Sequence, residues 1–318
     1  MRDAVREAGE LCRRLRLSPD LASAAASGAG QFSIFVPPSY LSRIRPGDPR
    51  DPLLRQVMPV VDEAVVVPNF TTDPVGDSAA SLRPGVLKKY IGRALLITTG
   101  ACAVHCRYCF RRHFSYEEIP HSDAAWDSAL TTIAEDPSIT EVILSGGDPL
   151  MLVDFRLAAL ADKIAAIPHV QRLRIHTRLP IMIPSRVTKE LIVWLTSSRL
   201  TPVVVIHANH AQEIDNDVAQ SLAPLRQAGV MLLNQAVLLR GINDSTAALK
   251  DLSERLLEIS VVPYYLHQLD RVAGAAHFEV PITQGRQIMQ ELRALLPGYA
   301  IPRYVQEVAG MPNKTVLA

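Results

Sequence analysis

The feature that most constrains the fold is a series of short apolar runs, rich in β-branched residues, that recur about every 30 residues after residue 141. Stretches with helical periodicity lie between these runs. Strands that alternate with helices form βα units, which build a parallel sheet with helices outside it. We predict strands over residues 94–99, 141–145, 173–176, 203–207, 231–235 and 262–266. The predicted helices cover residues 123–135, 153–167, 187–197, 216–228, 245–258 and 282–296.

The number of these units predicts the fold class. Six βα units indicate an α/β protein with a partial (βα)6 barrel of the TIM type, and a doubly wound open sheet is the main alternative. The predicted strands are apolar on both faces, so we expect both sides of the sheet to be covered. In either fold, binding and catalytic residues belong at the carboxyl ends of the strands.

The first part of the chain follows a different pattern. We predict that residues 1–87 form an N-terminal extension to a main domain over residues 88–318, with a short amphipathic helix at Val5–Leu17. Residues 36–87 contain many prolines, which interrupt regular elements, so we expect a mostly irregular segment over the main domain. The extension is expected either to close the open side of the barrel or to mediate self-association into a homo-oligomer.

Composition excludes several classes of protein. With 33 Lys and Arg against 32 Asp and Glu, the net charge is +1, which gives no electrostatic basis for binding nucleic acid or an acidic membrane surface. No apolar run reaches the roughly 18–20 residues that a membrane span needs. The first twenty residues are charged throughout and lack the apolar core of a signal peptide. We therefore expect a cytoplasmic protein.

Three of the four cysteines form a C-x3-C-x2-C loop directly after the first predicted strand: Cys102, Cys106 and Cys109. Three thiolates on a short loop can bind three corners of a cubane [4Fe-4S] cluster and leave the fourth iron open to a small molecule. The alternative is a structural zinc site completed by His105, His113 or Cys12. Closed zinc sites usually contain a second ligand pair further along the chain, and none is present here, so the cluster is favoured.

The cysteine loop, with an aromatic residue before its last cysteine, resembles the signature of the radical S-adenosylmethionine (SAM) enzymes. That family also has a partial (βα)6 barrel. Its glycine-rich segment is similar to Leu144–Pro149, which follows the second predicted strand. Gly146 and Gly147 allow a ligand to approach the backbone closely, and Asp148 offers an acceptor to an ammonium group. The resemblance implies that these three residues bind the methionine end of SAM.

Within the radical SAM enzymes, the sequence is similar to the lysine 2,3-aminomutase family, which combines SAM with pyridoxal 5′-phosphate (PLP). The similar segments run in the family's order and are Lys89–Arg93, Cys102–Phe114, Leu144–Pro149, Ile206–Ile214, Leu233–Asp244, Leu269–Phe278 and Lys314. The proline-rich segment PPSYLSRIRPGDPRDPLLRQVMP resembles the subgroup that makes β-lysine for the modification of elongation factor P.

The resemblance assigns cofactor roles to individual residues. Lys314 is implied to form the Schiff base with PLP, although a lysine in a loop with glycine and proline is usually a solvated surface residue. Two cations and a phenol just before the first strand suit a phosphate, and the resemblance assigns the PLP phosphate to them: Lys89, Tyr90 and Arg93. His207 and Gln235 are implied to contact SAM; the alternative for both is a buried polar group inside the barrel.

The resemblance also assigns substrate contacts and an activity. Arg111 is implied to bind the α-carboxylate of lysine, and Asp270 and Glu307 its side-chain ammonium. The longer mutases have aspartate in place of Glu307 and a C-terminal cysteine-rich zinc segment, whereas no cysteine follows Cys109 here. The implied enzyme is an isomerase that interconverts L-α-lysine and β-lysine, in the R form.

Partners are also implied by the resemblance. A flavodoxin-like or ferredoxin-like protein would supply the electron, and a ligase that attaches β-lysine to elongation factor P would be linked to the enzyme through the pathway. Two alternatives remain. The enzyme could act on another amino acid such as arginine or glutamate, or the chain could be a zinc-stabilised interaction module without catalytic activity.

Overall fold

The computed structural model describes residues 3–28, 32–119 and 123–318. Its centre is one sheet in which the strands follow each other in chain order from β1 to β10. All neighbours from β3 to β9 are parallel, whereas β1, β2 and β10 pair with their neighbours in antiparallel orientation. A doubly wound sheet would reverse its strand order, so this topology confirms the α/β class and the partial barrel.

The observed strands agree with the predicted ones and add four. The six predicted strands are observed as β3 (Arg93–Thr99), β4 (Glu141–Gly146), β5 (Arg172–Thr177), β6 (Thr201–His207), β7 (Met231–Val237) and β8 (Val262–His267). The count of six parallel strands was incomplete, because a seventh follows β8 and pairs with it. The additional strands are β1 (Ser81–Arg83), β2 (Val86–Leu87), β9 (Arg303–Gln306) and β10 (Thr315–Val316).

Helices connect the parallel strands and bury one apolar face each. They are α5 (Asp123–Ala134), α6 (Asp154–Ala165), α8 (Lys189–Thr196), α9 (Asn216–Gln227), α10 (Thr246–Glu258) and α11 (Ile282–Leu295), with the short helix α7 (Leu179–Met182) after β5. In α11, Ile288, Met289 and Leu292 are buried against the core at helical spacing. In β6, Val203 to Ile206 are all buried, as expected for a strand covered on both faces.

The N-terminal segment is more regular than predicted. The expected helix over Val5–Leu17 is the shorter α1 (Ala8–Arg14), and α2 (Pro19–Gly28) follows it. Two four-residue helices lie in the proline-rich part, α3 (Pro38–Leu41) and α4 (Pro52–Arg55). Both begin with proline at the first helical position, where a backbone donor is not needed, so the prolines start these helices instead of preventing them.

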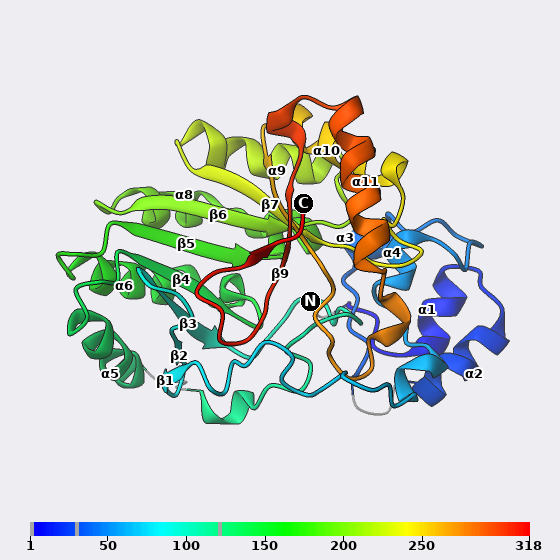
Figure 1. The fold of residues 1–318 in the computed structure, drawn as a ribbon, viewed down its shortest axis with the longest axis horizontal. Coiled ribbons are helices and arrows are strands. Elements are labelled where there is room, and N and C mark those ends of the chain that lie inside the picture. Colours follow the sequence, from blue (N-terminus) through cyan, green and yellow to red (C-terminus); the bar gives the residue numbers. More distant parts are fainter. Residues whose placement is uncertain (1–2, 29–31, 120–122) are drawn as a thin grey trace.

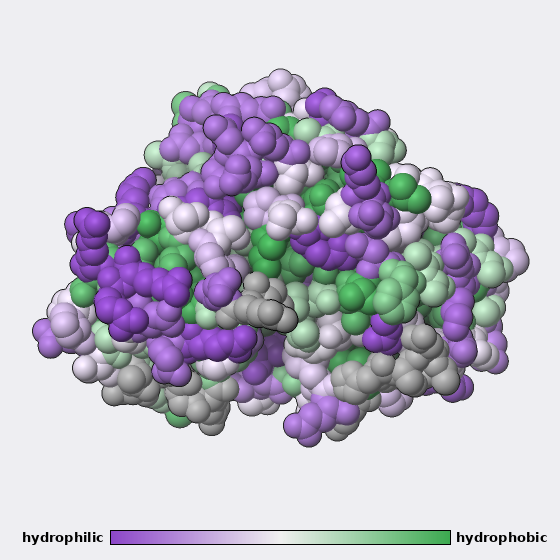
Figure 2. Space-filling model, turned by 180° about the vertical axis from the view of Figure 1, so that it is seen from behind, coloured by the Kyte–Doolittle hydropathy of each residue, from purple (hydrophilic) through white to green (hydrophobic). Residues whose placement is uncertain are grey.

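The N-terminal segment packs against the carboxyl ends of the strands. The arrowheads of β5 and β6 point toward the side of the molecule where α3 and α4 lie (Figure 1). Seen from behind, hydrophobic residues occur in small groups among hydrophilic ones (Figure 2). Among the residues that the structure describes, no helix is both long and apolar enough to cross a bilayer. The division at residue 87 stays a prediction.

Candidate functional site

A cavity of about 700 Å³ lies inside the partial barrel. A volume of this size is typical of sites for cofactors and small molecules. Every residue that the sequence nominated for the site lines this one cavity: Lys89, Tyr90, Arg93, Cys102, Cys106, Cys109, Arg111, Gly146, Gly147, Asp148, His207, Gln235, Asp270, Glu307 and Lys314. Lys314 and the three thiols therefore share one space, although about 200 residues of sequence separate them.

The cysteine loop follows β3, and the N-terminal segment holds it from outside. The backbone N–H of Arg107 donates to the carbonyl oxygen of Gln56 at 2.9 Å. The Arg107 guanidinium is fully buried and its Nε donates to Glu63 Oε1 at 2.8 Å. Burial and the neighbouring thiols raise the pKa of Cys109 to about 11 and that of Cys102 well above its usual value. Three half-buried cysteines that line one cavity suit a cationic iron–sulfur cluster, which holds them as thiolates.

The residues proposed as zinc ligands are engaged elsewhere. His105 stacks on Phe32, and its Nδ1 lies 2.9 Å from the carbonyl oxygen of Ser33. His113 Nε2 lies 3.1 Å from the carbonyl oxygen of Ala273, and Cys12 lies on the buried face of α1, in the core. Within the described residues, no three His, Cys, Asp or Glu side chains are grouped to bind a single metal ion. The arrangement does not favour the zinc site.

Two glycines at the end of β4 lie against the end of β3 and the start of the cysteine loop. Gly146 has φ +127°, and a Cβ there would lie 2.6 Å from the Thr99 carbonyl oxygen. A Cβ on Gly147 would lie 2.4 Å from the carbonyl oxygen of Ala101. Only glycine allows both the conformation and the close approach at this point. The two glycines therefore fix the position of the loop that contains Cys102.

Asp148 is buried and bound to the protein. Its carboxylate accepts hydrogen bonds from Thr177 Oγ1 at 2.7 Å, from the backbone N–H of Arg178 at 2.7 Å, and from the N–H groups of Leu150 and Leu179 at 3.0 Å. Burial raises its pKa to about 6, although these donors oppose the shift. Asp148 thus joins the end of β4 to the end of β5, while its predicted contact with SAM stays a prediction.

A chain of alternating charges crosses the cavity. Arg111 Nε donates to Asp77 Oδ2 at 2.7 Å, and Lys89 Nζ lies 2.7 Å from Asp77 Oδ1. Lys89 Nζ also donates to Glu307 Oε1 at 3.2 Å, and Lys314 forms an ion pair with Glu307 Oε2. Asp77 was not found from the sequence because it lies in the proline-rich segment and is joined to the site only by folding. It orients both Arg111 and Lys89.

The two predicted acids of the site differ in charge state. Burial opposes ionisation of Glu307, but Lys314 and Lys89 outweigh it and hold the pKa of Glu307 at about 2. Burial and the charge of Glu307 raise the pKa of Asp270 to about 7, against the opposing effect of Lys314 and Lys89. Two titratable groups with pKa values this far apart are typical of a functional site. A cation that enters beside Asp270 would meet a carboxylate ready to ionise.

The remaining nominated residues also line the cavity. The Arg93 guanidinium lies over the Tyr90 ring at 5.4 Å, and burial together with Glu307 raises the pKa of Tyr90. His207 and Gln235 are neighbours at the carboxyl ends of β6 and β7. The hydroxyl of Tyr108 lies 3.2 Å from His207 Nε2, and burial and Arg178 lower the pKa of His207 to about 3, so this histidine is neutral.

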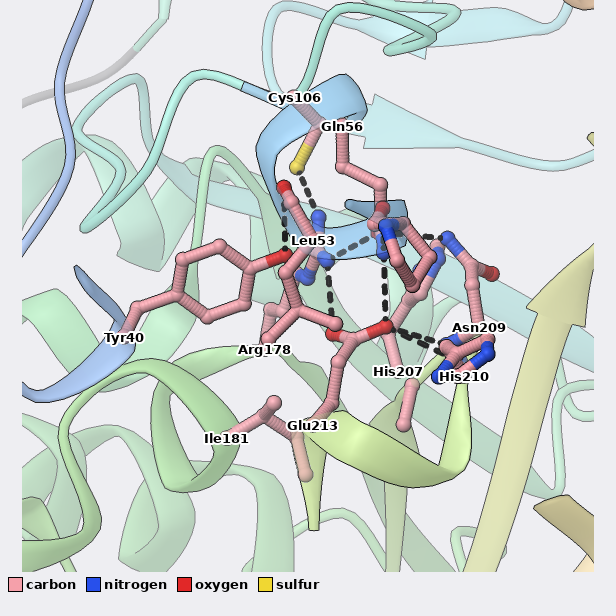
Figure 3. Close-up of polar contacts among 12 residues, drawn as sticks. Tyr40, Leu53, Gln56, Cys106, Arg178, Ile181, His207, Asn209, His210 and Glu213 are labelled. Carbon is pink, nitrogen blue, oxygen red and sulfur yellow. Dashed lines mark hydrogen bonds and ion pairs between the residues drawn. The ribbon is translucent and has the colours of Figure 1, made fainter. Parts of the chain in front are cut away.

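A buried polar network joins the cysteine loop to β5 and β6 (Figure 3). At its centre Arg178 donates to Cys106 Sγ, to Gln56 Oε1 and to Glu213 Oε2. Burial opposes ionisation of Glu213, but Arg178 and the donors of Gln56 and Asn209 lower its pKa below the usual value. The sequence motifs nominated none of Gln56, Arg178 and Glu213. Their spacing along the chain gives no signal, because each contact spans tens of residues.

Comparisons with known proteins find an iron–sulfur domain and relatives that match nearly the whole chain. Residues 91–173 match the model of a 4Fe-4S single cluster domain. The chain is 48% identical over 316 residues to L-lysine 2,3-aminomutase of Escherichia coli (strain K12), covering 99% of this chain and 92% of that protein. It is 44% identical over 318 residues to L-lysine 2,3-aminomutase of Haemophilus influenzae, covering 100% and 94%. Identity to L-lysine 2,3-aminomutase of Clostridium subterminale is 35% over 319 residues, covering 99% and 76%.

Solved structures show the same architecture. The crystal structure of Streptococcus suis SuiB bound to the precursor peptide SuiA matches with a TM-score of 0.51 at 14% identity, covering 66% of this chain and 47% of that one. At this identity the likeness concerns the fold alone.

Proposed function

Because this chain belongs to the lysine 2,3-aminomutase family of radical SAM enzymes, which are isomerases, we propose that it converts L-α-lysine to (R)-β-lysine with PLP as a further cofactor. The observation that carries the proposal is the shared cavity of the three thiols and Lys314. Bound there, the cluster and SAM supply a carbon radical that removes the non-acidic hydrogen at C3, and PLP supplies the π bond across which nitrogen migrates.

The residues present fit the cluster and SAM. Cys102, Cys106 and Cys109 line the cavity and would bind three irons, so that the fourth iron would have no protein ligand. The close backbone at Gly146 and Gly147 would accept the methionine end of SAM, with Asp148 toward its ammonium. His207 and Gln235, at neighbouring strand ends, would contact the rest of SAM.

The opposite charges in the cavity suit PLP. Lys314 is the proposed attachment lysine, and its ion pair with Glu307 keeps the amine inside the cavity. Arg93, Tyr90 and Lys89 would hold the phosphate, since guanidinium and ammonium groups are the usual phosphate donors. Lys89 is also paired with Asp77 and Glu307. Phosphate binding would therefore redistribute the partners of Lys89.

Selection of lysine follows from charge. A buried ammonium has to be paired, because an isolated buried charge costs several kcal/mol. Asp270 and Glu307 offer two carboxylates for the side-chain ammonium, and they would repel the side-chain carboxylate of glutamate. Arg111, oriented by Asp77, would bind the α-carboxylate. Arginine is the competing substrate that this charge pattern tolerates.

The place of the enzyme in metabolism is also proposed from resemblance. The proline-rich N-terminal segment supports the subgroup whose β-lysine a ligase attaches to elongation factor P. The cluster needs one electron at a time, which a flavodoxin-like or ferredoxin-like donor would supply. Such a reaction belongs in the cytoplasm.

We propose that residues 1–87 form an extension to the barrel domain of residues 88–318, in which contacts such as Arg107 with Glu63 cover the cysteine loop. Self-association through this extension would give a homo-oligomer.

Product analysis tests the function directly. The anaerobically reconstituted protein is incubated with SAM, PLP, dithionite and L-lysine, and the products are separated on a chiral column. We expect (R)-β-lysine, and parallel reactions with L-arginine and L-glutamate should give little or no β-amino acid. If arginine gave a β-amino acid faster than lysine did, arginine would be the substrate instead of lysine.

A further inference from the structure

Arg178, the residue after β5, contacts a cysteine of the predicted cluster site. Its Nη1 donates to Cys106 Sγ, while its Nη2 donates to Gln56 Oε1 at 2.6 Å and to Glu213 Oε2 at 2.9 Å (Figure 3). We propose that Arg178 is a positioning residue that fixes the Cys106 thiolate and raises the reduction potential of the cluster. We also propose that the N-terminal segment, through Gln56, keeps Arg178 in this position. The inference rests on the proposed function only in requiring that the cluster binds.

The backbone of Arg178 is anchored by the glycine-rich segment. Its N–H donates to Asp148 Oδ2 at 2.7 Å, and the next N–H, of Leu179, donates to the same oxygen at 3.0 Å. Asp148 is 4% exposed and sits directly after the two glycines that pack against the cysteine loop. The position of the Arg178 backbone relative to the loop is therefore fixed by the segment Gly146–Asp148.

The side chain of Arg178 has little freedom to move. It is 7% exposed and lies over the rings of Tyr40 and Tyr108, at 5.8 and 5.6 Å from their centroids. Glu213 is fully buried and accepts from the backbone N–H groups of Asn209 at 2.8 Å and His210 at 3.1 Å. A carboxylate held this firmly orients the guanidinium through its planar donor geometry, which a lysine could not reproduce.

Gln56 connects this network to the N-terminal segment. Its Nε2 donates to Glu213 Oε1 at 3.0 Å, and its Oε1 accepts from Asn209 Nδ2 at 3.0 Å as well as from Arg178. The backbone carbonyl oxygen of Gln56 accepts a hydrogen bond from the backbone N–H of Arg107, the residue after Cys106. Gln56 is fully buried. One residue of the N-terminal segment thus contacts both the loop that contains Cys106 and the arginine that donates to it.

The consequence for the cluster is electrostatic. On reduction the cluster takes one electron from an external donor, its formal charge falls from 2+ to 1+, and no bond is made or broken. A cationic donor on a ligand sulfur favours the more negative, reduced form, and hydrogen bonds to cluster sulfurs are a known means of setting the potential. Glu213 partly balances the charge of Arg178, but it is held on the Nη2 side while Nη1 contacts the sulfur.

The test is the midpoint potential of the reconstituted protein, followed by electron paramagnetic resonance without lysine. Arg178→Gln removes the charge, Arg178→Lys keeps it, and Arg186→Gln is the control, because Arg186 pairs with Asp154 away from the cysteines. We expect the glutamine variant to bind four irons with a potential at least about 59 mV more negative, which is a tenfold change in the reduction equilibrium. The lysine variant should recover part of the shift, and the control should match the wild type.

Two results would overturn the inference: an Arg178→Gln protein with four irons and the wild-type potential, or an equal shift in the Arg186→Gln control. If Arg178→Gln folds but binds no cluster, Gln56→Leu decides the question, because it removes the support of Arg178 without touching a cysteine. A more negative potential in Gln56→Leu supports the inference, and an unchanged one contradicts it. Since no lysine is present, failure here is separable from failure to make β-lysine.

Discussion

Replacing Asp270 with asparagine should stabilise the apoprotein above neutral pH while it removes lysine turnover. The pKa of Asp270 is raised from 3.8 to about 7 by burial and by the charge of Glu307. Between these values the folded state binds more protons than the unfolded state, so the stability of the wild type falls as pH rises. A difference of about three units between the folded and unfolded pKa of Asp270 lowers the free energy of unfolding by about 4 kcal/mol once the group is ionised, and asparagine avoids this cost. Because its amide needs new partners, we expect a net gain of about 2 kcal/mol at pH 8.

Denaturant unfolding of the cluster-free, reduced protein at pH 5 and pH 8 measures this gain. At pH 5 Asp270 is protonated, so the variant and the wild type should differ by less than about 0.5 kcal/mol. Asp127→Asn is the control, because Asp127 is a surface partner of Lys163 with 60% of its side chain exposed, and it should leave stability nearly unchanged at both pH values. In the holoenzyme, Asp270→Asn should lower kcat/KM for lysine by about 100-fold or more, since the substrate ammonium loses a carboxylate. This reasoning would be refuted if the stability difference between Asp270→Asn and the wild type were no larger at pH 8 than at pH 5.

Three further changes probe the cavity. Gly146→Ala places a Cβ 2.6 Å from the Thr99 carbonyl oxygen at φ +127° and should lower the free energy of unfolding by about 2–3 kcal/mol. Gly298→Ala is the control, because the space around Gly298 is open, and it should cost less than about 1 kcal/mol. Equal losses in the two variants would contradict the close approach. Asp77→Asn releases Arg111 and Lys89, so it should raise the KM for lysine about tenfold in steady-state assays and leave the iron content unchanged. An unchanged KM would show that Asp77 does not contribute to substrate binding. Lys314→Ala should lose the Schiff-base absorption of added PLP but keep the cluster spectrum, and retention of that absorption would place the Schiff base on another lysine.

The fold was predictable because its signals are local. Each βα unit has its own apolar strand and amphipathic helix, and the topology follows from repeating that unit. The strand β9 was missed because four residues after Pro302 are too short for a pattern, and its place is decided by pairing with β8. The helices α3 and α4 are not predictable from the proline content, because proline usually interrupts a helix, whereas here it begins each one.

The candidate site divides in the same way. The three cysteines lie within eight positions, so their spacing predicts a cluster site, whereas the glycine segment is assigned to SAM through the family resemblance. Residues such as Asp77, Arg178 and Glu213 were not nominated, because their importance comes from partners distant in the chain. Gln56 and Arg178, for example, are 122 positions apart. A single sequence contains no information on such pairs until the barrel brings them together. The roles of the nominated residues toward SAM, PLP and lysine stay predictions.

The most direct test identifies the lysine that forms the Schiff base with PLP in a protein that also contains its cluster. Lys314 and Lys89 both contact Glu307 in the cavity, so they are the two competing amines. The reconstituted protein, with four irons per chain, is treated with PLP and borohydride, digested and mapped by mass spectrometry. We predict one phosphopyridoxyl group, on Lys314, and its loss when excess L-lysine precedes the reductant. A label on Lys89 would contradict Lys314 as the attachment lysine, and a label on a surface lysine, unaffected by L-lysine, would contradict the shared cavity as the reaction centre.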